Sequence, residues 1–288
     1  MASELEFYLL DESYEAAREK RYHAMKYASW YSEDYHIFQT TKEESLIRAL
    51  RNNMDACGIP IETSKGEWGP GQEEINFKYA EALAFLQGKA ISFMAKIGDD
   101  LAGNSCHLHA SLWDAESNTP LFHDKSAEHG MSKLFRHYLA GQLALAKEMT
   151  YCFAPSINSY KRFQSGSFAP TEAAWSLDNR TAGFRVITGG AGTRVECRIP
   201  GADCNPYLAF AASLAAGLHG IDNELELPAA FEGNMYAAKR VPDVPKTLRA
   251  ALAAFKKSKV LGAPPSARRW SATTSTPANG SSASTTGA

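Results

Sequence analysis

Hydrophobic and polar residues alternate along several short stretches of the chain, and this spacing predicts strands. ELEFYLLD begins at Glu4 and HLHASLWD begins at His107, while GEWGPGQEEINF is a Gly/Pro loop that leads into a short strand. FRVITGGAGTRVECRIP, from Phe184, contains two β-branched runs joined by glycines and predicts a hairpin. No helix is expected after these glycines and no G-K-[ST] is present, so a hairpin turn is favoured over a phosphate loop.

Apolar residues recur at helical spacing in other segments. The predicted helices cover residues 41–57, 80–98, 129–153, 205–225 and 245–260. Thr41 and Glu44 are spaced as a capping box, and Pro245 suits the first turn of the last helix. Residues 12–32 predict either helix or irregular structure. Because the strands are segregated from the helices, we expect an α+β domain with an antiparallel sheet.

The composition is that of an ordinary soluble globular protein. Of 288 residues, 44% are hydrophobic and 22% are charged, and the formal net charge is -2. This balance argues against nucleic acid or a membrane as a partner, and no apolar run is long enough to span a bilayer. The N-terminus lacks the features of a signal peptide. The five scattered cysteines include no C-x-x-C pair, so we expect reduced thiols in a cytoplasmic protein.

Acidic, basic and imidazole side chains share single faces of the predicted strands. They are Glu4 and Glu6, then His107 and His109, then Arg194, Glu196 and Arg198, with Glu67 and Glu74 at the Gly/Pro loop. Each group alone is most often a solvated face. If the faces converge, however, crowded carboxylates demand cations, and oxygen ligands with an imidazole suit Mg²⁺ or Mn²⁺ better than zinc. Arginines beside them suggest a polyanionic substrate and phosphoryl transfer.

Six motifs, in this order, resemble the successive signatures of the glutamine synthetase family. They are ELEFYLL, GEWGPGQEE, GNSCHLHASL, NSYKRF, DNRTAGFR and RVECRIPGADCNPYL, and the resemblance runs from Glu4 to about Val260. It implies an antiparallel sheet curved into half a barrel, with helices packed outside. It also implies an ATP-dependent ligase that phosphorylates the γ-carboxylate of glutamate and lets ammonia or a small amine displace the phosphate. Two or more Mg²⁺ or Mn²⁺ ions and a homo-oligomer are further implications.

The resemblance also implies roles for individual positions. Glu6, Glu67 and Glu74 match ligands of the metal nearest glutamate, and Glu4, His107 and Glu196 match ligands of the metal on the ATP phosphates. Nucleotide-binding positions match His109, Ser111, Arg185 and Arg194, with Arg185 also near the transferring phosphate. Glutamate-binding positions match Gly103, Arg162 and Arg198, and Arg162 and Arg180 are the expected catalytic arginines.

Two positions depart from the family pattern. Ala102 stands where the family carries Asn, which removes one hydrogen bond to the amino group of glutamate. Phe168 stands where ammonia-using members place a flap glutamate that helps to bind and deprotonate ammonium. A phenyl ring can do neither, but it can pack against an alkyl chain. The stretch therefore resembles members that use amines such as methylamine, ethanolamine or polyamines, and we expect Phe168 to contact the substrate.

The chain resembles a family member that is truncated at both ends. We expect residues 1–262 to be the catalytic domain, without the β-rich domain that precedes it in the family, and residues 263–288 to be a disordered low-complexity tail. The abrupt loss of periodicity suggests a tail read in a shifted frame. Two main interpretations follow: an active glutamate–amine or glutamate–ammonia ligase, or a truncated, non-catalytic relative. A metal-dependent hydrolase or kinase would fit the metals but not all six motifs.

Overall fold

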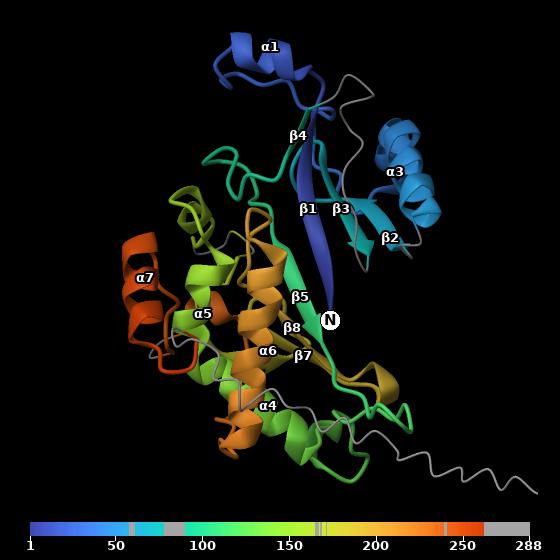
Figure 1. The fold of residues 1–288 in the computed structure, drawn as a ribbon. Helices are drawn as coiled ribbons and strands as arrows, with labels where there is room; N and C mark the ends of the chain where they lie inside the picture. Colours follow the sequence, from blue (N-terminus) through green and yellow to red (C-terminus); the bar gives the residue numbers. More distant parts are fainter. Residues whose placement is uncertain are drawn as a thin grey trace, which may run out of the picture.

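The fold is built on one open β-sheet, and helices lie against it (Figure 1). The computed structural model describes residues 1–57, 61–77, 90–164, 167, 169–170, 172–238 and 241–261. The strands are β1 (Ala2–Leu10), β2 (Ile61–Gly66), β3 (Gln72–Phe77), β4 (Ala90–Ser92), β5 (Cys106–Ala110), β6 (Trp175–Leu177), β7 (Phe184–Ile187) and β8 (Arg194–Cys197). Their order is β2-β3-β1-β5-β8-β7-β6, and β4 pairs with the part of β1 that β5 leaves free.

The sheet is antiparallel except at one end. The predicted hairpin is confirmed, because β7 and β8 pair antiparallel around the glycine turn. β6 and β7, however, are parallel. The short segment between them runs back along the sheet through Asp178, which has a left-handed φ of 45°. The α+β class is thus confirmed, with a mixed rather than a purely antiparallel sheet.

The helices are α1 (Tyr14–Glu19), α2 (Ile37–Thr40), α3 (Glu44–Ala56), α4 (Lys133–Ala144), α5 (Ala146–Phe153), α6 (Pro206–Asp222) and α7 (Leu248–Lys257). Helices α3, α4, α5 and α6 pack on one face of the sheet. Apolar side chains of α4, α5 and α6 pack against the odd-numbered residues of β1 and β8 and the even-numbered residues of β5 and β7, such as Leu108, Phe184 and Val195. A second core joins α3 to Phe7 and Leu9 of β1. Since side chains alternate along a strand, the intervening residues lie on the opposite face. We call it the helix-free face, because α3, α4, α5 and α6 all pack on the other one.

Helices α4 and α6 approach each other very closely. A Cβ atom added to Gly141 would lie 2.1 Å from the carbonyl oxygen of Ala216, and one added to Gly220 would lie 2.0 Å from that of His137. Both positions therefore exclude any larger residue. The absence of side chains lets the two backbones touch, which fixes how α6 lies over the sheet.

Several helix predictions are wrong in detail. Of the predicted helix 80–98, residues 90–98 form β4 and irregular structure, and residues 78–89 lie outside the described part of the chain. Ala90–Ser92 pair with β1, so backbone pairing at the strand edge overrides a weak helical period. The predicted helix 129–153 is two helices, because Leu145 has φ −106° and ψ 11°.

The predicted helix caps also differ. Thr41 does not cap α3, because α2 and a 3₁₀ turn precede α3 and the hydroxyl of Thr41 donates to the carbonyl of Ile37. Pro245 lies before α7, whose N-cap is Thr247. Within 12–32 only Tyr14–Glu19 is helical. Each correction shifts a boundary, and the helices at 41–57, 205–225 and 245–260 are otherwise confirmed.

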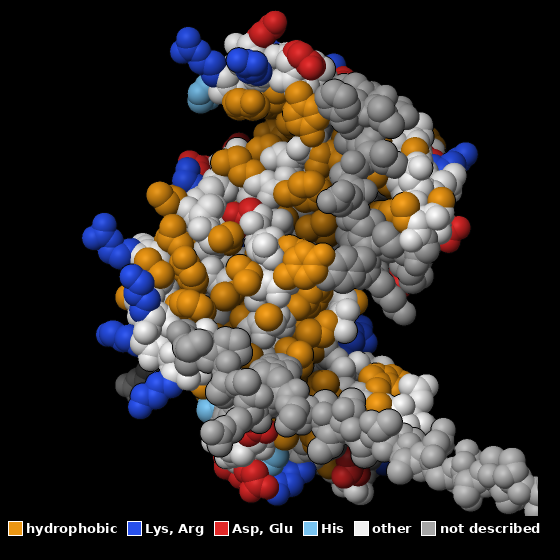
Figure 2. All heavy atoms as spheres, viewed as in Figure 1, with side chains coloured by type: hydrophobic (Ala, Val, Ile, Leu, Met, Phe, Trp, Pro, Cys, Tyr) orange, Lys and Arg blue, Asp and Glu red, His pale blue; other side chains and the backbone are white. Residues whose placement is uncertain are grey.

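One face of the molecule carries many hydrophobic side chains, and it includes the surface over α6 (Figure 2). Tyr207 and Leu208, in the first turn of α6, are 68% and 57% exposed. No helix in the described ranges is both long and apolar enough to cross a membrane. Because α6 packs on the helix-covered face of the sheet, this apolar surface is on the other side from the charged residues described next.

Candidate active site

Three glutamates form an acidic group on the helix-free face, here called the glutamate cluster. Glu6 of β1 and Glu74 of β3 are directly opposite each other in the strand pairing. Glu67 joins them from the turn between β2 and β3, and one carboxylate oxygen of each lies within 4.8 Å of the others. The family resemblance assigns these three residues to one metal, and the fold brings them together.

The glutamate cluster carries more negative charge than its neighbours balance. Lys65 is opposite Glu74 and donates to its Oε1 atom, and the Lys65 Nζ atom lies 3.9 Å from Glu67 Oε1. Glu67 Oε1 is buried and has no hydrogen-bond partner in the described ranges. Burial, with the charges of Glu6 and Glu74, raises the pKa of Glu67 to about 9. An orphaned oxygen within a crowded carboxylate group fits a divalent cation.

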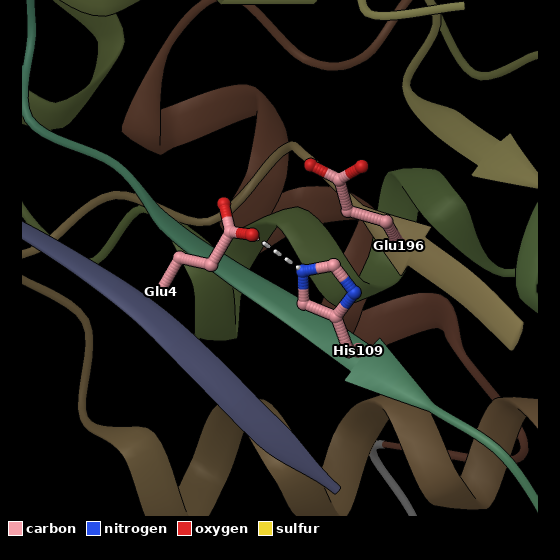
Figure 3. A group of neighbouring side chains, drawn as sticks. All are labelled: Glu4, His109 and Glu196. Atoms are coloured by element: carbon pink, nitrogen blue, oxygen red, sulfur yellow. Dashed lines mark hydrogen bonds and ion pairs between the residues drawn. The ribbon is translucent and has the colours of Figure 1, made fainter. Parts of the chain in front are cut away.

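A second group, here called the histidine cluster, contains Glu4, His107, His109 and Glu196. Figure 3 shows Glu4 from β1, His109 from β5 and Glu196 from β8 pointing toward one another. His109 Nε2 lies 3.1 Å from Glu4 Oε1, and His107 Nδ1 lies 3.0 Å from Glu4 Oε2 and 3.4 Å from Glu196 Oε1. Ligand atoms of Glu4, His109 and Glu196 lie within 4.8 Å of one another. Both imidazoles thus lie beside the carboxylate of Glu4, whereas sequence reasoning selected only His107 as a metal ligand.

The bonds of the histidine cluster define its charge state. Arg194 Nε donates to His109 Nδ1 over 3.2 Å, so Nε2 carries the hydrogen that His109 donates to Glu4. Burial opposes ionisation of Glu4, but hydrogen bonds from His107 and His109 outweigh it and hold the pKa of Glu4 well below its usual range. Glu4 is therefore a carboxylate, ready to bind a cation.

Arginines surround Glu196, the most buried acid of the histidine cluster. Arg185 Nη1 donates to Glu196 Oε2 over 2.8 Å, and Arg198 Nη1 donates to Glu196 Oε1. Burial would raise the pKa of Glu196, but His107 and Arg198 lower it to about 2. Arg185 also donates to the exposed Asp178, over 3.0 Å from Nε. The strand register explains the contact, because Glu196 of β8 is opposite Arg185 of β7.

A cavity of about 560 Å³ opens between these groups. Its lining includes all three residues of the glutamate cluster, Glu4 and His107 of the histidine cluster, and Gly103, Arg162, Arg180 and Arg198. A second cavity of about 430 Å³ is lined by His109, Ser111 and Arg194, together with Glu4, which also lines the first. The fold thus places Gly103, Arg162 and Arg198 at one cavity and His109, Ser111 and Arg194 at another, and the two cavities share Glu4. Arg185, also predicted to bind the nucleotide, is not among the lining residues of either cavity.

Residues 1–264 match the family described as glutamine synthetase, catalytic domain. The chain belongs to this family. It is 45% identical over 267 residues to the γ-glutamylethanolamide synthetase of Streptomyces coelicolor, an alignment that covers 87% of the chain and 56% of that protein. It is 37% identical over 268 residues to a glutamate–isopropylamine ligase of a Pseudomonas species, which covers 87% and 58%. The chain thus spans about half the length of these relatives.

The chain is also similar to a glutamine synthetase and to a solved structure. The chain is 37% identical over 244 residues to the glutamine synthetase of Thermus thermophilus, covering 76% of the chain and 54% of that protein. It also matches a solved structure described as apo GmaS without ligand, with a TM-score of 0.78, 28% identity and coverage of 90% of this chain and 63% of that one. Family membership and fold therefore agree, and the family in general depends on ATP and divalent metal ions.

Sequence reasoning missed Gln72, which links Glu6 to the loop that carries Gly103 and Asn104. Its Nε2 atom donates to Asn104 Oδ1 over 2.9 Å, to the Gly103 carbonyl over 3.2 Å and to Glu6 Oε2 over 3.3 Å. Tyr8 OH similarly donates to the Ala102 carbonyl over 3.0 Å. The quoted GPGQ motif contained Gln72, so a signal was present. Gln72 holds the loop that carries Gly103 against the glutamate cluster.

Gly103 is held directly against Arg162. A Cβ atom on Gly103 would lie 2.4 Å from Arg162 Cγ, so only glycine allows the loop to approach this side chain. The cavity wall also includes Tyr35 and Trp68, which the sequence analysis did not select. Phe168 lies outside the described residues, as does the predicted tail 263–288.

Proposed function

We propose that this protein is an ATP-dependent ligase that joins the γ-carboxyl group of glutamate to a small amine or to ammonia. The observation that carries the proposal is the juxtaposition of two cation-ready acidic groups around cavities lined by arginines. Family membership and the names of the relatives agree with this chemistry.

The proposed reaction has two steps. An oxygen of the glutamate γ-carboxylate attacks the γ-phosphorus of ATP, the bond to the β,γ-bridging oxygen breaks, and ADP leaves. The amine nitrogen then attacks the carbonyl carbon of the γ-glutamyl phosphate, phosphate leaves with the C–O electron pair, and the nitrogen loses a proton. Phosphoryl transfer is mostly a matter of positioning and charge neutralisation, which suits a site built from carboxylates and guanidinium groups.

The two acidic groups would hold Mg²⁺ or Mn²⁺. Glu6, Glu67 and Glu74 would bind one ion beside the glutamate, and Glu4 and Glu196, with imidazoles of the histidine cluster, would bind another beside the phosphates. Ions bound there would offset the negative charge of the reacting oxygens. The imidazole contact favours Mn²⁺ slightly over Mg²⁺, and the oxygen atoms suit either ion.

The arginines would bind the anionic groups of the substrates. Arg162 and Arg198, both buried at the cavity wall, would take the glutamate carboxylate, and Arg180 would take the transferring phosphoryl group. Arg185, tied to Glu196, would adjoin the same phosphate. His109, Ser111 and Arg194 line the second cavity, where the nucleotide would lie.

The acceptor is proposed to be a short-chain amine, because Phe168 replaces the flap glutamate of ammonia-using members. Two relatives named for ethanolamine and isopropylamine products support this choice. We predict that Phe168→Glu shifts the preference toward ammonia by about tenfold, since a carboxylate attracts ammonium and cannot pack on an alkyl chain. Competition assays with ethylamine and ammonium, with the exposed Phe38→Tyr as the control, would measure the ratio. An unchanged ratio would remove Phe168 from the amine site.

Assembly and location are part of the proposal. Members of the family form homo-oligomers in which neighbouring chains complete each site, so we propose a homo-oligomer in the cytoplasm. The five scattered cysteines, none in a disulfide among the described residues, are compatible with a reducing compartment.

A phosphate-release assay tests the function. The chain is incubated with ATP, glutamate, Mg²⁺ or Mn²⁺ and a panel of amines that includes ammonia, methylamine, ethanolamine and putrescine. Release that requires both glutamate and an amine, with a γ-glutamylamide product seen by mass spectrometry, is the expected result. Release without glutamate would favour a phosphatase or kinase. Metal binding with no turnover would favour a non-catalytic relative.

A further inference from the structure

Arg162 is one of the largest fully buried side chains of the described residues, at 2% exposure. Its Nη1 atom donates to the Ile199 carbonyl over 3.0 Å, and its Nε atom is buried without a hydrogen-bond partner. The side chain is clamped between two glycines, because Cβ atoms on Gly103 and Gly201 would lie 2.4 Å from Arg162 Cγ and 3.3 Å from Arg162 Nη1. A guanidinium buried in this way needs a negative charge close by.

Asp203 lies beside Gly201, the glycine next to the guanidinium of Arg162. The same Cβ position on Gly201 is 2.7 Å from Asp203 Oδ1, so any side chain at Gly201 would crowd both Asp203 and Arg162. Burial lowers the pKa of Arg162, and the negative charge of Asp203 partly offsets this effect. Asp203 Oδ1 is buried and has no hydrogen-bond partner within the described ranges. This oxygen leaves the negative charge of Asp203 available to balance the charge of Arg162.

Two serines fix the other oxygen of Asp203. Ser156 and Ser159 donate their hydroxyl groups to Asp203 Oδ2 over 2.8 and 2.7 Å. Ser156 precedes the 3₁₀ turn Asn158–Arg162 and Ser159 lies within it. Asn158 joins the turn to the backbone of Lys96 by two hydrogen bonds of 2.8 Å. The carboxylate is thereby held rigidly against the turn that carries Arg162.

Glu6 is the other acid that stabilises the charge of Arg162. Glu6 Oε2, however, accepts from the Ser105 amide over 2.8 Å, and Glu6 belongs to the glutamate cluster. A cation bound to that cluster would offset the negative charge of Glu6. Asp203 would then be the acid left to balance Arg162 when the substrate binds.

We propose that Asp203 is a positioning residue, whose serine-anchored carboxylate holds the Arg162 guanidinium in place to receive the carboxylate of the substrate. This inference rests on the proposed function, which makes Arg162 a binder of glutamate. Asp203 does not touch the substrate, so its effect is exerted through Arg162. Ser156 and Ser159 in turn hold the carboxylate of Asp203 in place by their hydrogen bonds to Oδ2.

The test is Asp203→Asn, which keeps the volume and an oxygen for the serine hydroxyls but removes the charge. We expect the KM for glutamate to rise at least about tenfold, while the KM for ATP and the Tm stay close to those of the unaltered chain. Asp243→Asn, at an exposed acid paired with Lys246 over 2.9 Å, is the matched control and should change none of these values.

Each outcome is decisive. Equal losses of affinity for glutamate and ATP, or a lower Tm with normal glutamate affinity, would make Asp203 structural and overturn the inference alone. An unaltered chain without glutamate-dependent turnover would overturn the proposed function as well. If Asp203→Asn does not fold, Ser159→Ala replaces it. That variant should raise the KM for glutamate about threefold, and an unchanged value would overturn the inference.

Discussion

At the scale of single residues, the alternation of side chains along β1 explains how one strand serves two acidic groups. Glu4 and Glu6 point to the same face, yet Glu4 meets His107 of β5 whereas Glu6 meets Glu74 of β3. Neighbouring strands on the two sides of β1 therefore separate the two carboxylates. Their mutual repulsion is offset by imidazoles at one and by an ammonium group at the other.

Lys65 is the ammonium group that serves the glutamate cluster, and a bound cation would compete with it. Its Nζ atom bonds Glu74 and also lies 5.5 Å from the centre of the Tyr35 ring. We predict that Lys65→Met tightens Mn²⁺ binding about three- to tenfold, because two charges then no longer compete for the same carboxylates. Calorimetric titration of the chain with Mn²⁺ measures this change, and Lys161→Met, an exposed site, is the control. Weaker binding in Lys65→Met would mean that Lys65 assists the metal.

Glu196 joins Arg185, Arg198 and the imidazoles, so its loss should be severe. We predict that Glu196→Ala lowers phosphate release by at least about a hundredfold, because it removes a metal ligand and leaves two arginines without their buried partner. Glu226→Ala, at an exposed position, should retain full activity. Near-normal turnover of Glu196→Ala would show that the metal assignment is wrong.

At the scale of elements, the segment between α1 and α2 packs a buried acid against β2. Glu33 is 1% exposed, and a Cβ atom on Gly66 would lie 2.5 Å from its Oε2 atom. Burial raises the pKa of Glu33 above its usual value. A protonated carboxyl group is therefore favoured in the folded state, and the fold loses stability as the pH rises from the unfolded pKa of about 4.3 toward the raised folded pKa.

Because the fold loses stability as the pH rises, we predict that Glu33→Gln stabilises the fold more at pH 8 than at pH 5. Glutamine is neutral at both pH values. At pH 8 the substitution should therefore raise the free energy of unfolding by about 1.4 kcal/mol for each unit by which the folded pKa is raised. Urea unfolding at the two pH values measures it, with the exposed Glu19→Gln as the control. An equal gain at pH 5 and pH 8 would contradict a raised pKa.

Much of this architecture could be predicted where a periodic pattern met a strong local signal. The hairpin at 184–197 and helix α6, with Asn205 as cap and Pro206 in its first turn, are examples. The strand at Ala90–Ser92 could not be predicted, because its pairing with β1 is a tertiary contact that its own sequence does not encode. The same limit applied to the site: motifs located Glu6 and Glu74, but the three contacts of Gln72 depend on the folded loops.

At the scale of the whole molecule, the two acidic groups connect strands from distant parts of the chain, so cations should stabilise the fold. We predict that Mn²⁺ or Mg²⁺ at a hundredfold excess over Kd adds roughly 2.7 kcal/mol to the free energy of unfolding for each site that it fills, which raises the Tm by several degrees. Differential scanning fluorimetry with and without EDTA measures it. The double variant Glu6→Gln, Glu74→Gln should lose much of the increase, and an equal Tm in metal and in EDTA would contradict both metal sites.

The central place of β1 has a consequence for how the chain folds. Glu4 and His107 are 103 positions apart, yet their strands are adjacent, and β5 must then find β8. Because these partners are far apart in the sequence, β1 must wait during synthesis for strands that are made much later. Such non-local pairing slows folding and leaves edges exposed in the meantime. Neither acidic group can form within a short fragment of the chain. We therefore expect metal binding and catalytic activity to appear late and together in a refolding experiment.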